Sequence, residues 1–175
     1  MISRWRSRVA LSLWATAAFA SLAWASFVRP MPRVIYNASA SVPVGWYRIE
    51  PALALHIGDI VLVHVPAEPA ALAARRHYLP SNVPLLKRIV ALAPQKVCIR
   101  GRTVRIDGVA IAATLPVDGA GRQLIAWSHC RRLRRGELFL LSTDSPASFD
   151  SRYFGPVTVF AVIGQAQPLR IEGAQ

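Results

Sequence analysis

The chain has 175 residues, of which 53% are hydrophobic and 17% are charged, and its 21 basic residues outnumber its 9 acidic ones. This composition excludes a disordered chain and a charged coiled coil, and the length excludes a second catalytic domain. Two cysteines are too few for a disulfide-scaffold fold or for a zinc site of four thiolates, and no fixed repeat indicates a solenoid or propeller. We therefore expect a small, basic protein with one core.

Residues 9–28 form a run of twenty residues without a charge. As a helix this run would span about 30 Å, the thickness of the hydrocarbon core of a bilayer. Three arginines lie within residues 1–8, and Arg29, Pro30 and Pro32 follow the run. The sequence therefore predicts a basic cytoplasmic head at 1–8, a transmembrane anchor at 9–28, and a single-pass protein whose remaining residues lie outside the cytoplasm.

Two other interpretations of the apolar run remain open. Ala23-Trp24-Ala25 has the small-x-small form of a signal-peptide cleavage site, although the apolar core of a signal peptide is shorter than this run. A buried helix of a soluble protein would be unusual at this length in so small a chain. Export of the following residues is expected for both the anchor and the cleaved signal peptide.

After residues 29–36, which we interpret as a linker, short β-branched and aromatic runs alternate with Gly, Pro and Asp. Such runs predict strands, and Asp107-Gly108 predicts a tight type I′ hairpin turn. One short helix is predicted at 68–77. The pattern predicts a mainly β, antiparallel domain over residues 37–175. Its predicted strands are 45–49, 60–65, 85–92, 97–99, 104–106, 138–141 and 157–164.

Residues that can carry chemistry lie in three segments. Residues 37–47 read Asn-Ala-Ser-Ala-Ser-Val-Pro-Val-Gly-Trp-Tyr, residues 85–90 read Leu-Leu-Lys-Arg-Ile-Val, and residues 144–156 read Asp-Ser-Pro-Ala-Ser-Phe-Asp-Ser-Arg-Tyr-Phe-Gly-Pro. Each segment alone is a weak signal, because a serine near a proline is usually a turn. A lysine in a strand likewise usually faces solvent.

Lys87 is the informative residue of the second segment. Side chains alternate along a strand, so Lys87 and Arg88 face opposite sides of the sheet and one of them is expected to point toward the core. Burial disfavours the charged form of a lysine, which lowers its pKa and leaves a neutral amine that can accept a proton. Such an amine can activate a serine hydroxyl, as in Ser-Lys nucleophilic catalysis.

The order and spelling of these segments resemble the type I signal peptidase family, and within it the conjugative-transfer (TraF-type) pilin-processing branch. The Ser-x-Pro-x-Gly-x-Tyr motif of that branch is matched at 41–47, and its Lys-Arg followed by aliphatic residues is matched at 87–90. Residues 148–156 match Ser-Phe-Asp-x-Arg-Tyr-Phe-Gly-Pro, and residues 58–61 resemble the family element Gly-Asp-x-Val. The resemblance implies an antiparallel signal-peptidase-like catalytic domain behind one N-terminal transmembrane helix.

The resemblance also implies roles for single residues. Ser41 would be the nucleophile and Lys87 the general base. The backbone N–H of Ser41 and the hydroxyl of Ser39 would stabilise the oxyanion. No metal ion or other cofactor is expected.

The third segment would support this dyad. Ser148 would hold the lysine through a hydrogen bond. Asp150 and Arg152 would order the surrounding loop, and a structural salt bridge remains as good an interpretation of this pair as a direct catalytic role.

Cys98 and Cys130 lie outside these motifs. In an oxidising, exported compartment two cysteines favour one disulfide, which would close a loop of roughly thirty residues. Two free, buried thiols remain the alternative.

The excess of arginine has two interpretations besides nucleic-acid binding. Arg75-Arg76, Arg131-Arg132 and Arg134-Arg135 form local clusters, but the interleaved aromatic residues of a base-stacking surface are missing. No nucleic acid is therefore expected as a partner. Contact with anionic membrane lipids and plain solvation of surface arginines both remain open.

The sequence thus predicts a membrane-bound serine endopeptidase of the bacterial inner membrane, with its catalytic domain on the periplasmic face. Its substrate would be the leader sequence of an exported precursor, expected to be a pilin subunit. A non-catalytic, membrane-anchored scaffold for pilus assembly or secretion is the alternative. A self-cleaving, repressor-like switch is disfavoured by the apolar run at 9–28.

Overall fold

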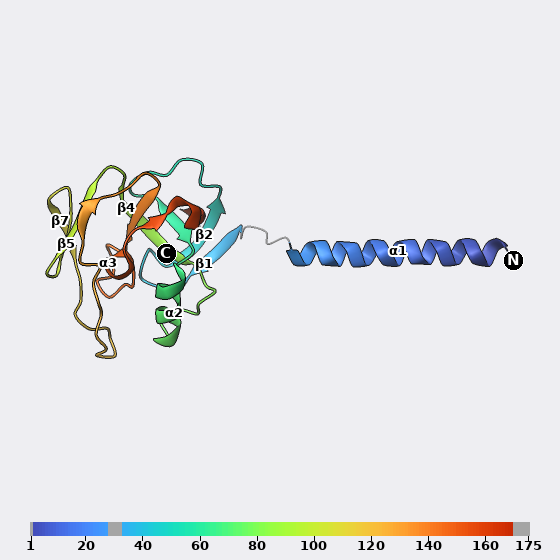
Figure 1. Cartoon of the computed structure of the whole chain (residues 1–175), viewed down its shortest axis with the longest axis horizontal. Helices are drawn as coiled ribbons and strands as arrows, with labels where there is room; N and C mark the ends of the chain where they lie inside the picture. The colour runs from blue at the N-terminus through green and yellow to red at the C-terminus, as the bar shows by residue number, and fades with distance from the viewer. Residues whose placement is uncertain (1, 28–32, 170–175) are drawn as a thin grey trace, which may run out of the picture. The chain divides into compact units, whose positions relative to one another are not determined.

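The computed structural model describes residues 2–27 and 33–169 of the chain. These residues belong to two compact units that divide between Met31 and Pro32. The first unit holds helix α1 (Ile2–Phe27), and the second holds eleven strands and three short helical segments (Figure 1). Each unit is described separately below.

Helix α1 includes residues 2–8 of the predicted head and residues 9–27 of the predicted anchor, while Met1, Val28 and residues 29–32 lie outside the described part of the chain. The hydroxyls of Thr16 and Ser21 donate to backbone carbonyls one turn earlier, at 2.9 and 2.8 Å. No helix of the described residues is long and apolar enough to cross a membrane. The transmembrane anchor predicted at 9–28 is therefore not supported by the structure.

The second unit is built mainly from antiparallel strands, which confirms the mainly β, antiparallel part of the predicted fold class. Its larger sheet has the strand order β1-β2-β11-β3-β4-β9-β10, and every neighbouring pair in it is antiparallel. The last strand, β11, therefore lies between β2 and β3 near the middle of the sheet. These strands are β1 (Val34–Asn37), β2 (Gly45–Glu50), β3 (Ile60–Val63), β4 (Leu85–Leu92), β9 (Glu137–Leu141), β10 (Val157–Thr158) and β11 (Val162–Pro168).

The smaller sheet has the order β7-β6-β5-β8 and consists of β5 (Lys96–Arg100), β6 (Thr103–Ile106), β7 (Val109–Ala113) and β8 (Cys130–Arg132). Strands β6 and β7 form a hairpin whose two loop residues, Asp107 and Gly108, have φ of 48° and 89°. Positive φ at both loop positions is what a type I′ turn requires, so the predicted turn is confirmed. The Asp107 carboxylate also accepts a hydrogen bond from the backbone N–H of Lys96, at 2.8 Å.

Three short helical segments complete this unit: α2 (Ala67–Arg75), α3 (Ser151–Phe154) and the 3₁₀ turn η1 (Val159–Ala161). The predicted helix at 68–77 is confirmed with its end two residues earlier. The segment 157–164 does not form one strand as predicted, because η1 interrupts it between β10 and β11. Strand β1 begins inside the predicted linker 29–36 and pairs with β2.

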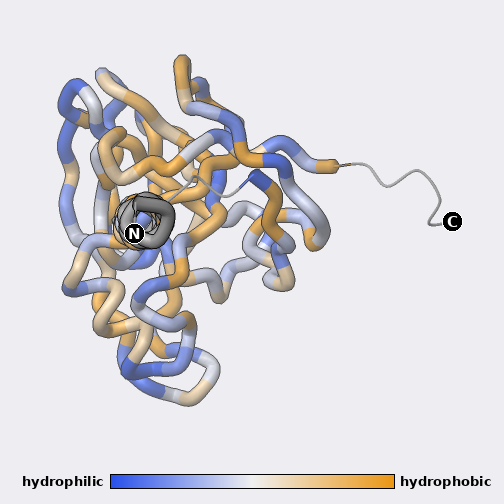
Figure 2. Tube along the Cα trace, turned by 90° about the vertical axis from the view of Figure 1, so that its right-hand side faces the viewer, coloured by the Kyte–Doolittle hydropathy of each residue, from blue (hydrophilic) through white to orange (hydrophobic). Residues whose placement is uncertain are grey.

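Apolar side chains of both sheets are buried in three clusters. One cluster joins the two sheets, since Ala91 and Phe139 of the larger sheet pack with Val97 and Val104 of the smaller one. In Figure 2 hydrophilic (blue) segments lie at several places around the edge of this unit, including its upper left and its lower end. All four residues of β3 are buried, as expected for a strand in the middle of a sheet that is covered on both faces.

Candidate active site

Ser41, the predicted nucleophile, lies on the loop between β1 and β2. The Asn37 side chain, at the end of β1, organises this loop. Its amide nitrogen donates to the carbonyl oxygens of Ser39, Val42 and Pro43, at 2.7, 3.0 and 3.1 Å, and its oxygen accepts from the N–H and the hydroxyl of Ser39, at 3.2 and 2.9 Å. The hydroxyl oxygens of Ser39 and Ser41 are 2.8 Å apart. One buried amide therefore fixes the position of both serines.

Lys87, the predicted base, lies in β4 directly opposite Val61 of β3. Only 3% of Lys87 is exposed, whereas Arg88 is half-buried and donates to the Gly58 carbonyl. This confirms that one of the two basic residues points toward the core. The Lys87 ammonium donates to the Ser148 hydroxyl at 2.5 Å.

Burial lowers the pKa of Lys87 from 10.5 to about 8. The nearby Asp150 carboxylate raises this pKa, and the Arg152 guanidinium lowers it again, so desolvation decides the direction. A lysine with such a pKa is neutral in a substantial fraction of molecules near pH 8, and the neutral amine can act as a base.

Asp150 and Arg152 form a buried ion pair near Lys87; Asp150 is 0% exposed and Arg152 is 1% exposed. The Asp150 carboxylate caps α3 by accepting from the backbone N–H of Arg152. Its two oxygens also accept from Nε and Nη2 of the Arg152 guanidinium, at 2.8 and 2.7 Å. The remaining Arg152 donors reach the carbonyls of Ala113, Ser145 and Ser148. Within the described residues Asp150 makes no hydrogen bond to Lys87, so the geometry favours the structural interpretation of the pair.

A pocket of about 490 Å³ brings the two ends of the predicted dyad together. Ser39, Ser41, Lys87 and Ser148 all line it, although these residues are up to 109 positions apart in sequence. No hydrogen bond joins Ser41 to Lys87 in the described part of the chain; each of the two side chains has another partner. The Ser41 N–H is also without a hydrogen-bond partner among these residues and can donate to a ligand.

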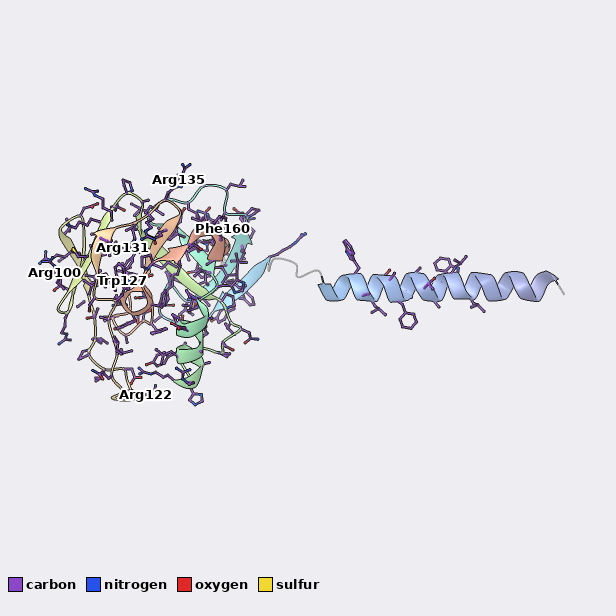
Figure 3. The ribbon with its side chains drawn as sticks, in the orientation of Figure 1. Arg100, Arg122, Trp127, Arg131, Arg135 and Phe160 are labelled. Carbon is purple, nitrogen blue, oxygen red and sulfur yellow. A yellow bond between two sulfur atoms is a disulfide. The ribbon has the colours of Figure 1, made fainter. Side chains whose placement is uncertain are left out.

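Another part of the pocket lining is held in place by Asp118. Its carboxylate accepts from the Tyr78 hydroxyl and from the Arg122 side chain, at 2.7 Å for the latter, and it lies 3.7 Å from the Arg76 guanidinium. Burial opposes ionisation, but the hydrogen bonds from Tyr78 and Arg122 hold the pKa of Asp118 well below its usual range. Arg76 also donates to the Gln123 carbonyl, so this network ties the segment 117–123 to the end of α2. Figure 3 shows Arg122 at the lower edge of the unit.

Comparison with known proteins shows the family. The model of the family described as "Signal peptidase, peptidase S26" matches residues 6–169 of the chain. The chain belongs to this signal peptidase family. A solved signal peptidase I from Enterococcus faecalis is also similar, with a TM-score of 0.39 and 23% identity, over 64% of this chain and 96% of that chain.

Conjugal transfer proteins are among the relatives of this signal peptidase family member. It is 33% identical to a probable conjugal transfer protein TraF of Sinorhizobium fredii over 144 aligned residues. The aligned region covers 75% of this chain and 73% of the relative. It is 34% identical to a conjugal transfer protein TraF of Agrobacterium tumefaciens over 172 aligned residues. This aligned region covers 93% of this chain and 95% of the relative. The resemblance to the signal peptidase family and to TraF proteins is thereby confirmed.

The second sheet of this signal peptidase family member carries the two cysteines. Cys98 of β5 and Cys130 of β8 lie opposite each other and are joined by a disulfide. Neither cysteine lines the pocket.

One of the arginine clusters takes part in internal contacts. Arg131 makes two hydrogen bonds to Glu137, at 2.6 and 3.0 Å, and its guanidinium lies 5.5 Å from the centre of the Trp127 ring. Figure 3 shows Arg131 and Trp127 close together, whereas Arg100 and Arg135 lie at the outer edge of the same unit. At least this arginine therefore has a structural role.

Sequence reasoning assigned no role to Asn37, Tyr78 or Asp118. For Asn37 a signal exists, because an Asn two residues before a serine often bonds to its backbone N–H in an Asx turn. Tyr78 and Asp118 are 40 residues apart, and no local pattern indicates that they meet.

Proposed function

We propose that the protein is a serine endopeptidase in which Ser41 is the nucleophile and Lys87 is the general base. The observation that carries this proposal is the buried Lys87 with its lowered pKa, which lines the same pocket as Ser41. An exposed lysine would be protonated at neutral pH and could not accept a proton. Membership of the signal peptidase family supports the same assignment.

In the proposed mechanism the neutral Lys87 amine takes the Ser41 proton while the Ser41 oxygen attacks the peptide carbonyl carbon. The free N–H of Ser41 donates to the oxyanion. The Lys87 ammonium then gives its proton to the leaving amine as the C–N bond breaks, which leaves an ester on Ser41. Lys87 next takes a proton from water as the water oxygen attacks the ester carbonyl carbon. When the bond between that carbon and the Ser41 oxygen breaks, the Lys87 ammonium gives its proton to the Ser41 oxygen, which releases the acid and restores both side chains.

The other predicted residues support the base in this proposal. Ser148 accepts a hydrogen bond from Lys87 and fixes the position of its amine. Asp150 and Arg152 hold the loop of Ser148, because Arg152 binds the Ser145 and Ser148 carbonyls. These two residues are proposed to act through the loop and not on the substrate.

The proposed substrate is the leader region of an exported precursor, such as a pilin subunit. The conjugal transfer names of the TraF relatives support a substrate from this system. We place the activity at the outer face of the cytoplasmic membrane. Exposed apolar side chains on α1 support association with lipid; they are Leu11, Leu13, Trp14, Phe19, Leu22 and Trp24.

The experiment is co-expression of the full chain with each small exported protein encoded near it, followed by intact-mass measurement of both proteins. Wild type is expected to shorten one precursor, and Ser41→Ala and Lys87→Met are each expected to abolish the cleavage. The double variant should be no worse than either single one, since the two side chains act as a unit. Ser128→Ala, an exposed serine outside the pocket, is the matched control.

Cleavage that persists in Ser41→Ala would contradict the mechanism. Binding of a precursor by wild type without any change of mass would instead favour a non-catalytic scaffold. Carbonate extraction of the same cells tests membrane association, because an anchored chain stays in the pellet and a peripheral chain is released.

A further inference from the structure

The hydrogen bonds around Asn37 have a direction that chemistry fixes. The Asn37 amide nitrogen lies against three carbonyl oxygens, those of Ser39, Val42 and Pro43. Carbonyl oxygens only accept hydrogen bonds, so the NH₂ group must face them and the amide cannot be turned around. The Asn37 side-chain oxygen must therefore face Ser39.

This oxygen sets the direction of the next two bonds. It can only accept, so the Ser39 hydroxyl, 2.9 Å away, donates its single proton to it. Ser39 then has only lone pairs left for the Ser41 hydroxyl, 2.8 Å away. The proton of Ser41 consequently points at Ser39, and Lys87 donates its hydrogen bond to Ser148 and makes none to Ser41 among the described residues.

We infer that Asn37 and Ser39 are positioning residues that hold the Ser41 hydroxyl turned away from Lys87 in the resting protein. Acylation then requires the Ser41 proton to turn from Ser39 to the Lys87 amine. The inference rests on the proposed function, because it assumes that Ser41 and Lys87 react together. It assigns Ser39 as an acceptor for Ser41 and not as the oxyanion donor expected from the sequence, since Asn37 already binds its proton.

The test measures the protonation of Lys87 and does not need cleavage. The chain has two lysines, Lys87 and the exposed Lys96, so carbon-13 labelling of the lysine ε-carbon gives two NMR signals, which Lys96→Arg assigns. A hydroxyl that donates to the neutral amine stabilises it and lowers the lysine pKa. The charged groups that act on Lys87 are Asp150 and Arg152, and both are kept in every variant. The full chain is titrated in detergent micelles.

The inference predicts a specific pattern. Ser39→Ala frees the Ser41 hydroxyl to turn to Lys87, so the pKa of Lys87 should fall by roughly one pH unit. Ser41→Ala should leave this pKa unchanged, because Ser41 makes no hydrogen bond to Lys87 in the described structure. Ser39→Thr keeps a hydroxyl that can make both bonds and should behave as wild type. Ser81→Ala removes another pocket-lining serine and is the control for changed solvation.

Two results would overturn the inference. A pKa that rises in Ser41→Ala and is unchanged in Ser39→Ala would show that Ser41 already donates to Lys87. A pKa unchanged in both variants would show that a turn of the hydroxyl cannot reach Lys87.

Cleavage kinetics separate this inference from the proposed function. Ser39→Ala should lower kcat less than about tenfold, whereas loss of an oxyanion donor lowers kcat by roughly 10² to 10³. A loss of that size with an unchanged Lys87 pKa would restore Ser39 as the oxyanion donor and overturn the inference. Failure of wild type to cleave any precursor would contradict the proposed function, while the NMR pattern would still decide the resting orientation of Ser41.

Discussion

The proton of the buried Lys87 is bound by a neutral hydroxyl, that of Ser148, at 2.5 Å, and not by a carboxylate. A hydroxyl cannot offset the loss of hydration that burial imposes on an ammonium, whereas a carboxylate in the same place would do so. The Asp150 carboxylate, which raises the pKa of Lys87, makes its hydrogen bonds to Arg152 and not to Lys87. The pKa of Lys87 is lowered because the buried ammonium is hydrogen-bonded to a hydroxyl while the carboxylate is bound to Arg152.

The first prediction concerns the pH dependence of cleavage. Lys87 acts as a base only when neutral, and its pKa is about 8, so kcat/KM should be low in acid and should rise through about pH 8. Single-turnover cleavage measured from pH 5 to pH 10 checks this. An optimum below pH 6 would exclude Lys87 as the base.

The second prediction is that Lys87→Met stabilises the protein while it abolishes cleavage. Methionine fills a similar volume without a charge to desolvate. Lys87 has a lower pKa folded than unfolded, so below about pH 8 its buried charge destabilises the fold by about 3 kcal/mol. Denaturant unfolding at pH 7 measures this difference.

The same substitution has a pH signature. Between pH 8 and 10.5 the unfolded wild-type chain binds more protons than the folded one. The free energy of unfolding of wild type therefore increases with pH in this window, whereas that of Lys87→Met lacks this increase. The advantage of Lys87→Met should therefore shrink across this window. An advantage that is constant from pH 7 to pH 10 would show that Lys87 does not titrate abnormally.

The third prediction concerns Asp150→Asn. The substitution leaves the buried Arg152 guanidinium without its counter-ion, and such a loss destabilises a protein by about 3–5 kcal/mol. It also removes the carboxylate that raises the pKa of Lys87, so the acid limb of any remaining activity should move to lower pH. Thermal unfolding and the pH profile are measured together. Glu50→Gln, which breaks the exposed Arg48–Glu50 pair, is the control and should change neither.

The fourth prediction concerns the pocket wall. Asp118→Asn keeps a side chain of the same shape but weakens the bonds from Tyr78 and Arg122 that hold the segment 117–123. Because residues of this segment line the pocket and make no hydrogen bond to Ser41, Lys87 or Ser148 among the described residues, KM should rise by about tenfold with kcat nearly unchanged. A fall in kcat with unchanged KM would contradict a role in substrate binding.

The fifth prediction concerns the disulfide. Cys98 and Cys130 are 32 positions apart, and a cross-link of that span stabilises the folded state by about 3–4 kcal/mol in the chain-entropy model. The double variant Cys98→Ala/Cys130→Ala should unfold at a lower temperature. It should still cleave below that temperature, since neither residue lines the pocket. Loss of cleavage in the folded variant would connect the second sheet to the site.

Strands with a clear apolar pattern were predictable from the sequence alone. Strand β4 was predicted to the residue, because Lys87 and Arg88 interrupt an otherwise apolar run whose length is typical of a strand. Strand β7 was missed, because its alanine-rich Val109–Ala113 is mostly exposed and carries little hydrophobic pattern. Strand β8 has three residues, too few for periodicity to be read.

The candidate site divides in the same way. The positions of Ser41, Lys87 and Ser148 in a common pocket agree with the motifs, which are short and local. The bonds that orient these groups depend on which strands meet in space. No local signal in the sequence shows that the Ser39 hydroxyl donates to Asn37 or that the Tyr78 hydroxyl donates to Asp118. Both hydrogen bonds depend on how the backbone folds.

The place of β11 in the larger sheet has a consequence for biosynthesis. Ser41 precedes β2, Lys87 lies in β4, and β11 (Val162–Pro168) is the strand that joins β2 to β3 and so to β4. A nascent chain that still lacks β11 has no continuous sheet to hold Ser41 and Lys87 in a common site. The proposed activity therefore requires that β11 has been synthesised and has paired with both β2 and β3.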